Sequence, residues 1–155
     1  MKGNRPISYW AGIFDGEGSV CIVHRLDKRA RTKATRGGAG EWYSVNVGIT
    51  NTCLALLTQL QRQWGGSIGE DKLRSVHHRR RWKWQANCRA GIKFLAAVRP
   101  YLIVKARDVS LALTLQDHVD RAGPHRTRRL TRADISARAA LSARLLSRRH
   151  QRTAA

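Results

Sequence analysis

The sequence predicts an α+β fold in which helices back one curved antiparallel sheet. Two segments, residues 42–50 and 81–88, alternate apolar and polar residues with the period of a half-buried strand. The first pairs in a predicted hairpin with residues 20–25, and a helical pattern over residues 53–64 separates the two hairpins. Two hairpins joined by a helix can form one sheet with helices on its back. The expected order is α-β-β-α-β-β-α, followed by extra helices.

The first half of the chain supplies clear boundary signals for these elements. Pro6 suits the first turn of a helix that ends near Gly16. Residues 28–40 hold five basic residues and three glycines and almost nothing apolar, which predicts a long mobile hairpin tip. Either Asn51 or Thr52 is expected to cap the helix over residues 53–64, whose apolar side is Leu54, Leu57 and Leu60, and the pair Gly65-Gly66 ends it.

The second half is predicted to hold the second hairpin, over residues 67–88, and three helices. Two tryptophans of this hairpin alternate with charged residues, so core packing is favoured over stacking on bases. Helices are expected over residues 91–101 and 105–121, and a Gly-Pro pair follows. The predicted domain core is residues 1–122, with residues 123–155 as an arginine-rich helical extension of the same domain. Its weak apolar stripe is Leu130, Ile135, Leu141 and Leu145, and Thr131 is its expected cap.

Charge indicates the class of partner. Thirty basic residues against ten acidic ones give a formal net charge of +20. Such a chain repels itself unless a polyanion screens it, so nucleic acid is the expected partner. A structural RNA-binding protein would carry the same charge, so charge alone leaves the activity open. Neither a signal peptide nor a membrane span is visible, which predicts an intracellular protein, and the spacing of the three cysteines argues against zinc and disulfides.

The segment WAGIFDGEGS, residues 10–19, is the most informative part of the chain. Gly12 and Gly16 are four residues apart and lie on one helical face with Ala11 beside them, so a second helix can approach at backbone distance. Glu17 follows where the helix stops. Two copies of this segment would place two carboxylates side by side, which suits divalent metals and phosphodiester chemistry. The alternative is an ordinary buried helix with Glu17 as a solvated turn residue.

Residues 10–18 resemble the LAGLIDADG motif of homing endonucleases position by position. Trp10 replaces the usual aliphatic residue, and Glu17 the more frequent aspartate. The resemblance implies a sheet saddle that binds double-stranded DNA, and Mg²⁺ held by Glu17 and the carbonyl of Gly16, with Mn²⁺ or Ca²⁺ as substitutes. Because only one motif is present, it also implies a homodimer that cuts a pseudo-palindromic target. The implied dimer interface comprises Trp10, Ala11, Gly12, Ile13 and Gly16.

Two further segments resemble parts of the same family. The run RPYLIVK, residues 99–105, matches the segment before an active-site lysine, which implies that Lys105 stabilises phosphate charge or orders the attacking water. A surface lysine at a helix start is the alternative. Residues 49–51 match the end of a strand where an amide organises active-site solvent, so Asn51 is the candidate, although a capping role explains it almost equally well. Asp15 is expected to support the helix end, and Asp108 to form a surface pair with Lys105 or Arg107.

Outward positions of the hairpins are the candidates for reading bases, because their side chains offer suitable donors and acceptors. They are Arg25, Ser44, Asn46, Thr50, Lys72, Arg74, Arg81, Lys83 and Gln85. The leading hypothesis is therefore a magnesium-dependent, site-specific DNA endonuclease of a mobile intron or intein, from a bacterial, archaeal or phage source. The alternative hypotheses are an intron RNA maturase and a non-catalytic DNA- or RNA-binding module on the same fold.

Overall fold

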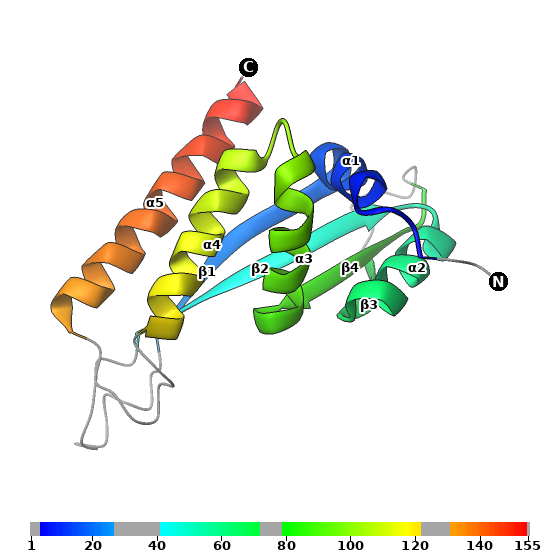
Figure 1. Ribbon diagram of the computed structural model, residues 1–155. Helices are drawn as coiled ribbons and strands as arrows, with labels where there is room; N and C mark the ends of the chain where they lie inside the picture. Colours follow the sequence, from blue (N-terminus) through cyan, green and yellow to red (C-terminus); the bar gives the residue numbers. More distant parts are fainter. Residues whose placement is uncertain (1–3, 27–40, 72–78, 122–130, 155) are drawn as a thin grey trace.

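The computed structural model describes residues 4–26, 41–71, 79–121 and 131–154. Its elements follow the predicted order, with helices packed on one face of a single antiparallel sheet and the other face left open (Figure 1). They are α1 (Ile7–Glu17), β1 (Gly18–Leu26), β2 (Glu41–Asn51), α2 (Leu54–Trp64), β3 (Ser67–Asp71), β4 (Arg81–Asn87), α3 (Cys88–Val98), the 3-10 helix η2 (Arg99–Tyr101), α4 (Ala106–Arg121) and α5 (Arg132–Ala154). The strand order is β1-β2-β4-β3. Among the described residues, no helix has the length and apolar character that a membrane crossing requires.

The helix predicted over residues 91–101 differs from the observed one at both ends. It starts at Cys88, directly after β4, and ends at Val98, where η2 takes over. Pro100 explains the end, because proline has no amide hydrogen to continue the α-helical bonds.

The core lies between the sheet and its helices and follows the predicted alternation. Along β2, Val45, Val47 and Ile49 are buried, as expected, and Trp84 of β4 is fully buried beside them. The indole Nε1 of Trp84 donates a hydrogen bond to the carbonyl of Gly65 at 2.8 Å, so its polar atom is satisfied. Core packing of this tryptophan is confirmed.

Helix α2 ends as predicted but presents a narrower apolar side than expected. Gly65 and Gly66 have φ values of 76° and 88°, which side chains rarely tolerate, so this pair stops the helix and turns the chain into β3. Leu57 and Leu60 are fully buried. Leu54 is 41% exposed, so its predicted place on the buried side was wrong; it sits in the first turn and its side chain is directed outward.

Helix α5 packs along α4 and the edge strand β1 (Figure 1). Its predicted cap is confirmed: the Thr131 hydroxyl accepts a hydrogen bond from the Asp134 amide at 3.1 Å, and the Asp134 carboxylate accepts one from the Thr131 amide at 2.9 Å. Leu141 and Leu145 are buried, as the stripe predicted. Leu130 and the Gly-Pro pair lie outside the described residues.

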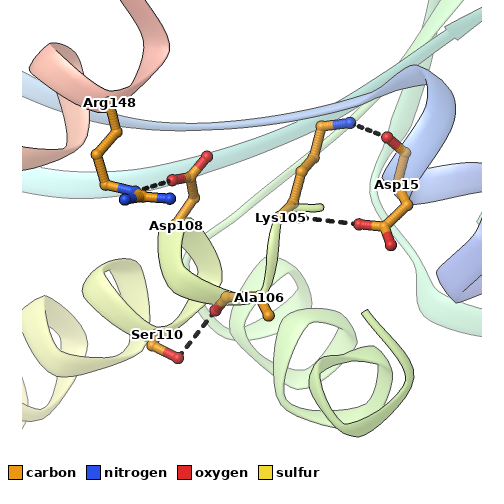
Figure 2. Close-up of polar contacts among 6 residues, drawn as sticks. All are labelled: Asp15, Lys105, Ala106, Asp108, Ser110 and Arg148. Carbon is orange, nitrogen blue, oxygen red and sulfur yellow. Dashed lines mark hydrogen bonds and ion pairs between the residues drawn. The ribbon is translucent and has the colours of Figure 1, made fainter. Parts of the chain in front are cut away.

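A buried ion pair joins α4 to α5. Asp108 is fully buried and accepts a hydrogen bond from Nε of Arg148 at 2.8 Å (Figure 2). The predicted surface pair of Asp108 with Lys105 or Arg107 was therefore wrong, because Asp108 shares the inward face of α4 with Val109.

A second arginine of α5, Arg138, is 1% exposed and donates to the carbonyl of His118 at 3.3 Å. Desolvation by burial lowers the pKa of its guanidinium, against the opposing influence of Asp134 and Tyr43. Some arginines of the extension, Arg138 and Arg148, therefore help to pack α5 against α4 and do not simply add charge to the surface.

The Asp108–Arg148 pair makes a testable contribution to stability. Arg148→Leu removes the guanidinium that is bonded to a buried carboxylate, so we expect the free energy of unfolding, measured by urea titration, to fall by about 3 kcal/mol. The matched control Arg132→Leu removes an exposed arginine of the same helix and is expected to change it by less than about 0.5 kcal/mol. The double variant Asp108→Leu/Arg148→Leu removes both charges and should recover part of the loss. Equal stability of Arg148→Leu and the control would contradict this role.

Candidate nuclease centre

The candidate site lies at the junction of α1 and β1. Glu17 is the last residue of α1, and Gly18 starts β1 without an intervening loop. A Cβ atom on Gly18 would lie 2.2 Å from the Phe14 ring and 2.5 Å from the Phe14 carbonyl oxygen. Since Phe14 is fully buried and cannot move away, only glycine permits this turn. The glycine that follows the acid therefore places the Glu17 carboxylate at the sheet edge, where it is exposed.

Strand register brings Asn51 to the same place. Gly18 pairs with Ile49 across β1 and β2, so Asn51, two residues further along β2, lies beside the end of α1. Its Nδ2 donates a hydrogen bond to Oε2 of Glu17. Its Oδ1 accepts one from the amide of Cys53 at 2.7 Å, which orients the chain that enters α2. The cap predicted at Asn51 or Thr52 was wrong: Cys53 is the N-cap of α2 and has no side-chain cap hydrogen bond, so the bond between Asn51 and Cys53 closes a turn just before the helix.

Asp15 connects the end of α1 to the segment before α4. Its carboxylate accepts hydrogen bonds from the backbone amides of Ile103 at 2.7 Å, Val104 at 3.2 Å and Lys105 at 2.9 Å. Burial acts to raise the pKa of the Asp15 carboxyl, but these three bonds and the charge of Lys105 outweigh it, so the pKa is lowered overall. The carboxylate supports a helix boundary, as predicted, but the boundary is the start of α4 rather than the end of its own helix.

Lys105 is brought to the site by this connection. Its ammonium donates a hydrogen bond to the backbone carbonyl of Asp15, near the C-terminal end of α1 (Figure 2). A cation is favoured there because the last carbonyls of a helix have no partner within it. The half-buried side chain therefore reaches the motif that carries Glu17. Lys105 also lies directly before α4, as the alternative of a lysine at a helix start expected, so its role in the site stays a prediction.

The oxygen donors of one chain suit a magnesium ion whose remaining ligands come from a substrate phosphate and water. Mg²⁺ is held by oxygen atoms, commonly from one or two carboxylates together with substrate phosphates and water. Glu17 and the carbonyl of Gly16 are exposed oxygen donors of this kind. Across the part of the chain that the structure describes, no group of three or more His, Cys, Asp or Glu residues could hold a metal ion. At this junction Glu17 is the exposed carboxylate, whereas the carboxylate of Asp15 accepts three backbone hydrogen bonds.

The two faces of α1 differ sharply. Trp10 and Ala11, predicted at a dimer interface, are fully buried inside their own chain, so that prediction was wrong for both. Trp10 also donates from Nε1 to Gln63 Oε1 at 2.7 Å. On the opposite face, Gly12 and Gly16 are exposed, and a Cβ atom on either would meet nothing within 4 Å. Ile13 is half-buried and packs against the core.

The open face of the sheet collects all the predicted base-reading residues that the structure describes. Strand register places them on the same side, away from the buried alternation of β2 and β4. They are Arg25, Ser44, Asn46, Thr50, Arg81, Lys83 and Gln85. Lys72 and Arg74 lie outside the described residues. The face offers guanidinium, ammonium, amide and hydroxyl groups over three adjacent strands.

Several of these side chains are oriented by neighbours. The guanidinium of Arg25 lies 5.5 Å from the ring centre of Trp42, an exposed tryptophan that the sequence interpretation did not single out. Arg81 forms an ion pair with Asp71 at 2.7 Å, which neutralises part of its charge. Cε of Lys83 would be 3.1 Å from a Cβ atom on Gly48, so the lysine stem passes over this glycine. The strict alternation of β2 is the signal that could have identified Trp42 as an open-face residue.

The hydrogen bonds of Asp15 predict a pH-dependent contribution to stability. Its pKa is lowered in the folded chain, so the carboxylate stabilises the fold above its unfolded pKa of about 3.9 and this stabilisation disappears as pH falls through the folded pKa. Asp15→Asn should lower the free energy of unfolding by about 2 kcal/mol at pH 7. Urea titrations should show this difference shrinking below about pH 4.

The control for this prediction is Asp117→Asn, which alters an exposed carboxylate of α4. Its free energy of unfolding should match that of the parent chain at pH 7 and at pH 2. A difference for Asp15→Asn that persists undiminished at pH 2, or none at pH 7, would contradict the assigned role.

Comparison with known proteins identifies the fold. No protein-family model matches the chain, and no curated protein sequence matches it. Among solved structures, the archaeal intron-encoded homing endonuclease I-Vdi141I, complexed with DNA, is similar with a TM-score of 0.69 and 17% identity over 92% of this chain and 82% of that one. The homing endonuclease I-CvuI, in complex with DNA in the presence of Mg, gives a TM-score of 0.67 at 14% identity over 92% and 80%.

A third similar structure has a longer chain. The LAGLIDADG homing endonuclease I-SmaMI, bound to cleaved DNA, gives a TM-score of 0.67 at 17% identity, and the match covers 90% of this chain but 43% of that one. This chain thus spans less than half of I-SmaMI but most of the other two. The sheet, its helices and the placement of the motif at the α1–β1 junction together show that the chain has the fold of the LAGLIDADG homing endonucleases.

Proposed function

We propose that this protein is a site-specific endonuclease that hydrolyses both strands of double-stranded DNA as a homodimer with a divalent metal. The observation that carries the proposal is the convergence of Glu17, Asn51 and Lys105, from three separate parts of the chain, at the end of α1. An exposed acid that receives an amide hydrogen bond beside a lysine is a constellation suited to phosphodiester chemistry.

The open face of the sheet supports duplex DNA as the substrate. A β-ribbon fits the major groove of B-DNA, where arginine and lysine recognise guanine and where asparagine and glutamine recognise adenine. Arg25, Asn46, Lys83 and Gln85 present these groups on one face. The chain carries a net charge of +20, and the similar structures of I-Vdi141I, I-CvuI and I-SmaMI hold DNA.

Each residue of the junction has a role in the proposed reaction. Glu17 and the Gly16 carbonyl would hold Mg²⁺, with Mn²⁺ or Ca²⁺ as substitutes. When bound, the metal lowers the pKa of a water ligand and stabilises charge on the phosphate. Asn51, through its amide bonded to Glu17, fixes the carboxylate and organises nearby water. Lys105 contributes a positive charge that stabilises the developing negative charge of the phosphate.

A homodimer follows from the need to cut two strands with one Glu17 per chain. The bare face of α1 at Gly12 and Gly16 allows the same helix of a second copy to approach closely. Next to it, the segment that Asp15 holds leaves Ile103 89% and Val104 55% exposed, and a second copy would cover such apolar side chains. Two-fold symmetry of the protein implies a target with approximate two-fold symmetry.

Replacement of Glu17 tests the chemistry directly. Purified protein with Mg²⁺ is incubated with a pool of randomised duplex DNA, and newly formed ends are sequenced. The parent chain should yield ends at one long, partly palindromic site. Glu17→Gln should bind that site with the parent affinity but cut it on the order of 10³-fold more slowly, because an amide does not replace a carboxylate as metal ligand.

Glu70→Gln is the matched control, since Glu70 is an exposed glutamate bonded to Arg80 on the surface. Loss of one surface ion pair should leave cutting unchanged. If Glu17→Gln cuts as fast as this control, Glu17 is not the metal ligand. If the parent chain enriches no ends from a pool that contains its binding site, the endonuclease proposal fails.

Replacement of Gly12 tests the dimer. Gly12→Val fits the monomer, because nothing lies within 4 Å of the added Cβ, but its bulk should keep a second α1 from close approach. Sedimentation at micromolar concentration should show a dimer for the parent chain and a monomer for Gly12→Val.

Gly69→Val provides the control, since Gly69 of β3 also has open space and lies away from α1. It should stay dimeric. A parent chain that sediments as a monomer, or a Gly12→Val chain that stays dimeric, would contradict the proposed interface.

A further inference from the structure

A basic groove lies between α4 and α5, apart from the open sheet face. It has a volume of about 590 Å³. Each helix lines it with a stripe at spacing i, i+3, i+4, i+7: residues 107–114 on α4 and 144–151 on α5. The stripes include Arg107, Ser110 and Thr114 on one side and Arg144, Ser147 and Arg148 on the other. Among the described residues, no acidic side chain lines this groove.

One of the three arginines is held in place by the interior of the protein. Nε of Arg148 bonds at 2.8 Å to the fully buried Asp108, which anchors the guanidinium at the groove (Figure 2). Because one edge of this planar group is committed to Asp108, its terminal nitrogens remain to bind a further anion. Arg107 and Arg144 are exposed, so they add positive charge that Asp108 does not offset.

The positive surface continues past the groove along the start of α4. A second hollow, lined by Arg99, Arg107 and Ser110, adjoins it and shares the last two residues. Nε of Arg99 donates to Oγ of Ser110 at 3.2 Å, so hydroxyl and guanidinium groups alternate along this surface. Arginine forks and hydroxyls are the groups that bind phosphate oxygens.

We infer that the α4–α5 groove binds the phosphodiester backbone of a nucleic acid strand other than the duplex proposed for the sheet. Seven residue steps of helix cover about 10 Å, which is enough for two or three consecutive phosphates. The groove lies between helices on the covered side of the sheet, so a strand bound there would not occupy the open face (Figure 1). The inference concerns a binding site separate from Glu17 and does not depend on cleavage.

The test compares two double variants with the same net charge. Arg107→Gln/Arg144→Gln alters the groove, whereas Arg89→Gln/Arg132→Gln removes two exposed arginines that do not line it. Arg148 is left intact because it compensates Asp108. The probes are fluorescein-labelled 12-nucleotide strands, oligo(dT) and oligo(rU), and anisotropy gives Kd over a series of salt concentrations. Thermal unfolding, monitored by circular dichroism, checks that the parent chain and both variants are folded.

The groove variant should bind more weakly and with a shallower salt dependence. Each phosphate contact of a single strand contributes about 0.7 to the slope of log Kd against log salt, so two lost contacts should reduce it by about 1.4. The control variant should keep the parent slope. Either probe can produce this result, and the one bound more tightly identifies the strand as DNA or RNA. Equal slopes for the two variants would overturn the inference.

A second measurement locates the probe on the protein. The Nε–Hε NMR signals of Arg107 and Arg144, assigned from their absence in the groove variant, should shift when oligo(dT) or oligo(rU) is added to the parent chain. If these signals stay unchanged while the probe binds, the strand lies elsewhere and the inference fails.

Discussion

The carboxylate of Asp15 is the constraint on which the arrangement of this molecule depends. It binds three consecutive backbone amides, at Ile103, Val104 and Lys105, almost ninety positions away in the chain. Those amides lie in the segment that leads directly into α4, so their bonds hold this segment, and Lys105 at its end, against α1. The end of α1 and the start of α4 are thereby joined two residues before Glu17. This contact and the packing of α4 on the sheet and on α3 together set where its side chains lie relative to the junction.

The position of α4 in turn determines that of α5. Asp108 lies in the first turn of α4 and binds Arg148, and the carbonyl of His118 near the other end of α4 accepts a hydrogen bond from Arg138. The two arginines are ten residues apart on α5, so the long helix is tied to its neighbour at both ends of their contact. Desolvating a guanidinium is costly, and for each arginine an oxygen of the partner helix offsets part of that cost.

Local patterns in the sequence predicted most of this fold, because strand alternation and helix ends depend on residues that are close together in the chain. Alternation along β2 and β4 separated the buried from the open face, and the Gly65-Gly66 pair located the end of α2. The same patterns could not reveal which outward charge meets another element. Asp108 has the ordinary surroundings of a surface residue until α5 covers it, and Trp10 and Ala11 share a motif with Gly12 but project from the opposite side of the helix. Contacts between residues distant in the chain decided these cases.

Gly48 shows how a glycine can leave the space that a long neighbouring side chain, that of Lys83, occupies. It sits in the middle of β2, opposite Ser19 on one side and Gln85 on the other, and the stem of Lys83 crosses the space above it. A Cβ atom at position 48 would lie 3.1 Å from the lysine Cε, so a larger residue there requires the lysine stem to shift. Substitutions at positions 48 and 83 should therefore have non-additive effects. A redesign of this surface should therefore choose the residues at positions 48 and 83 together, because each sets the space that is open to the other.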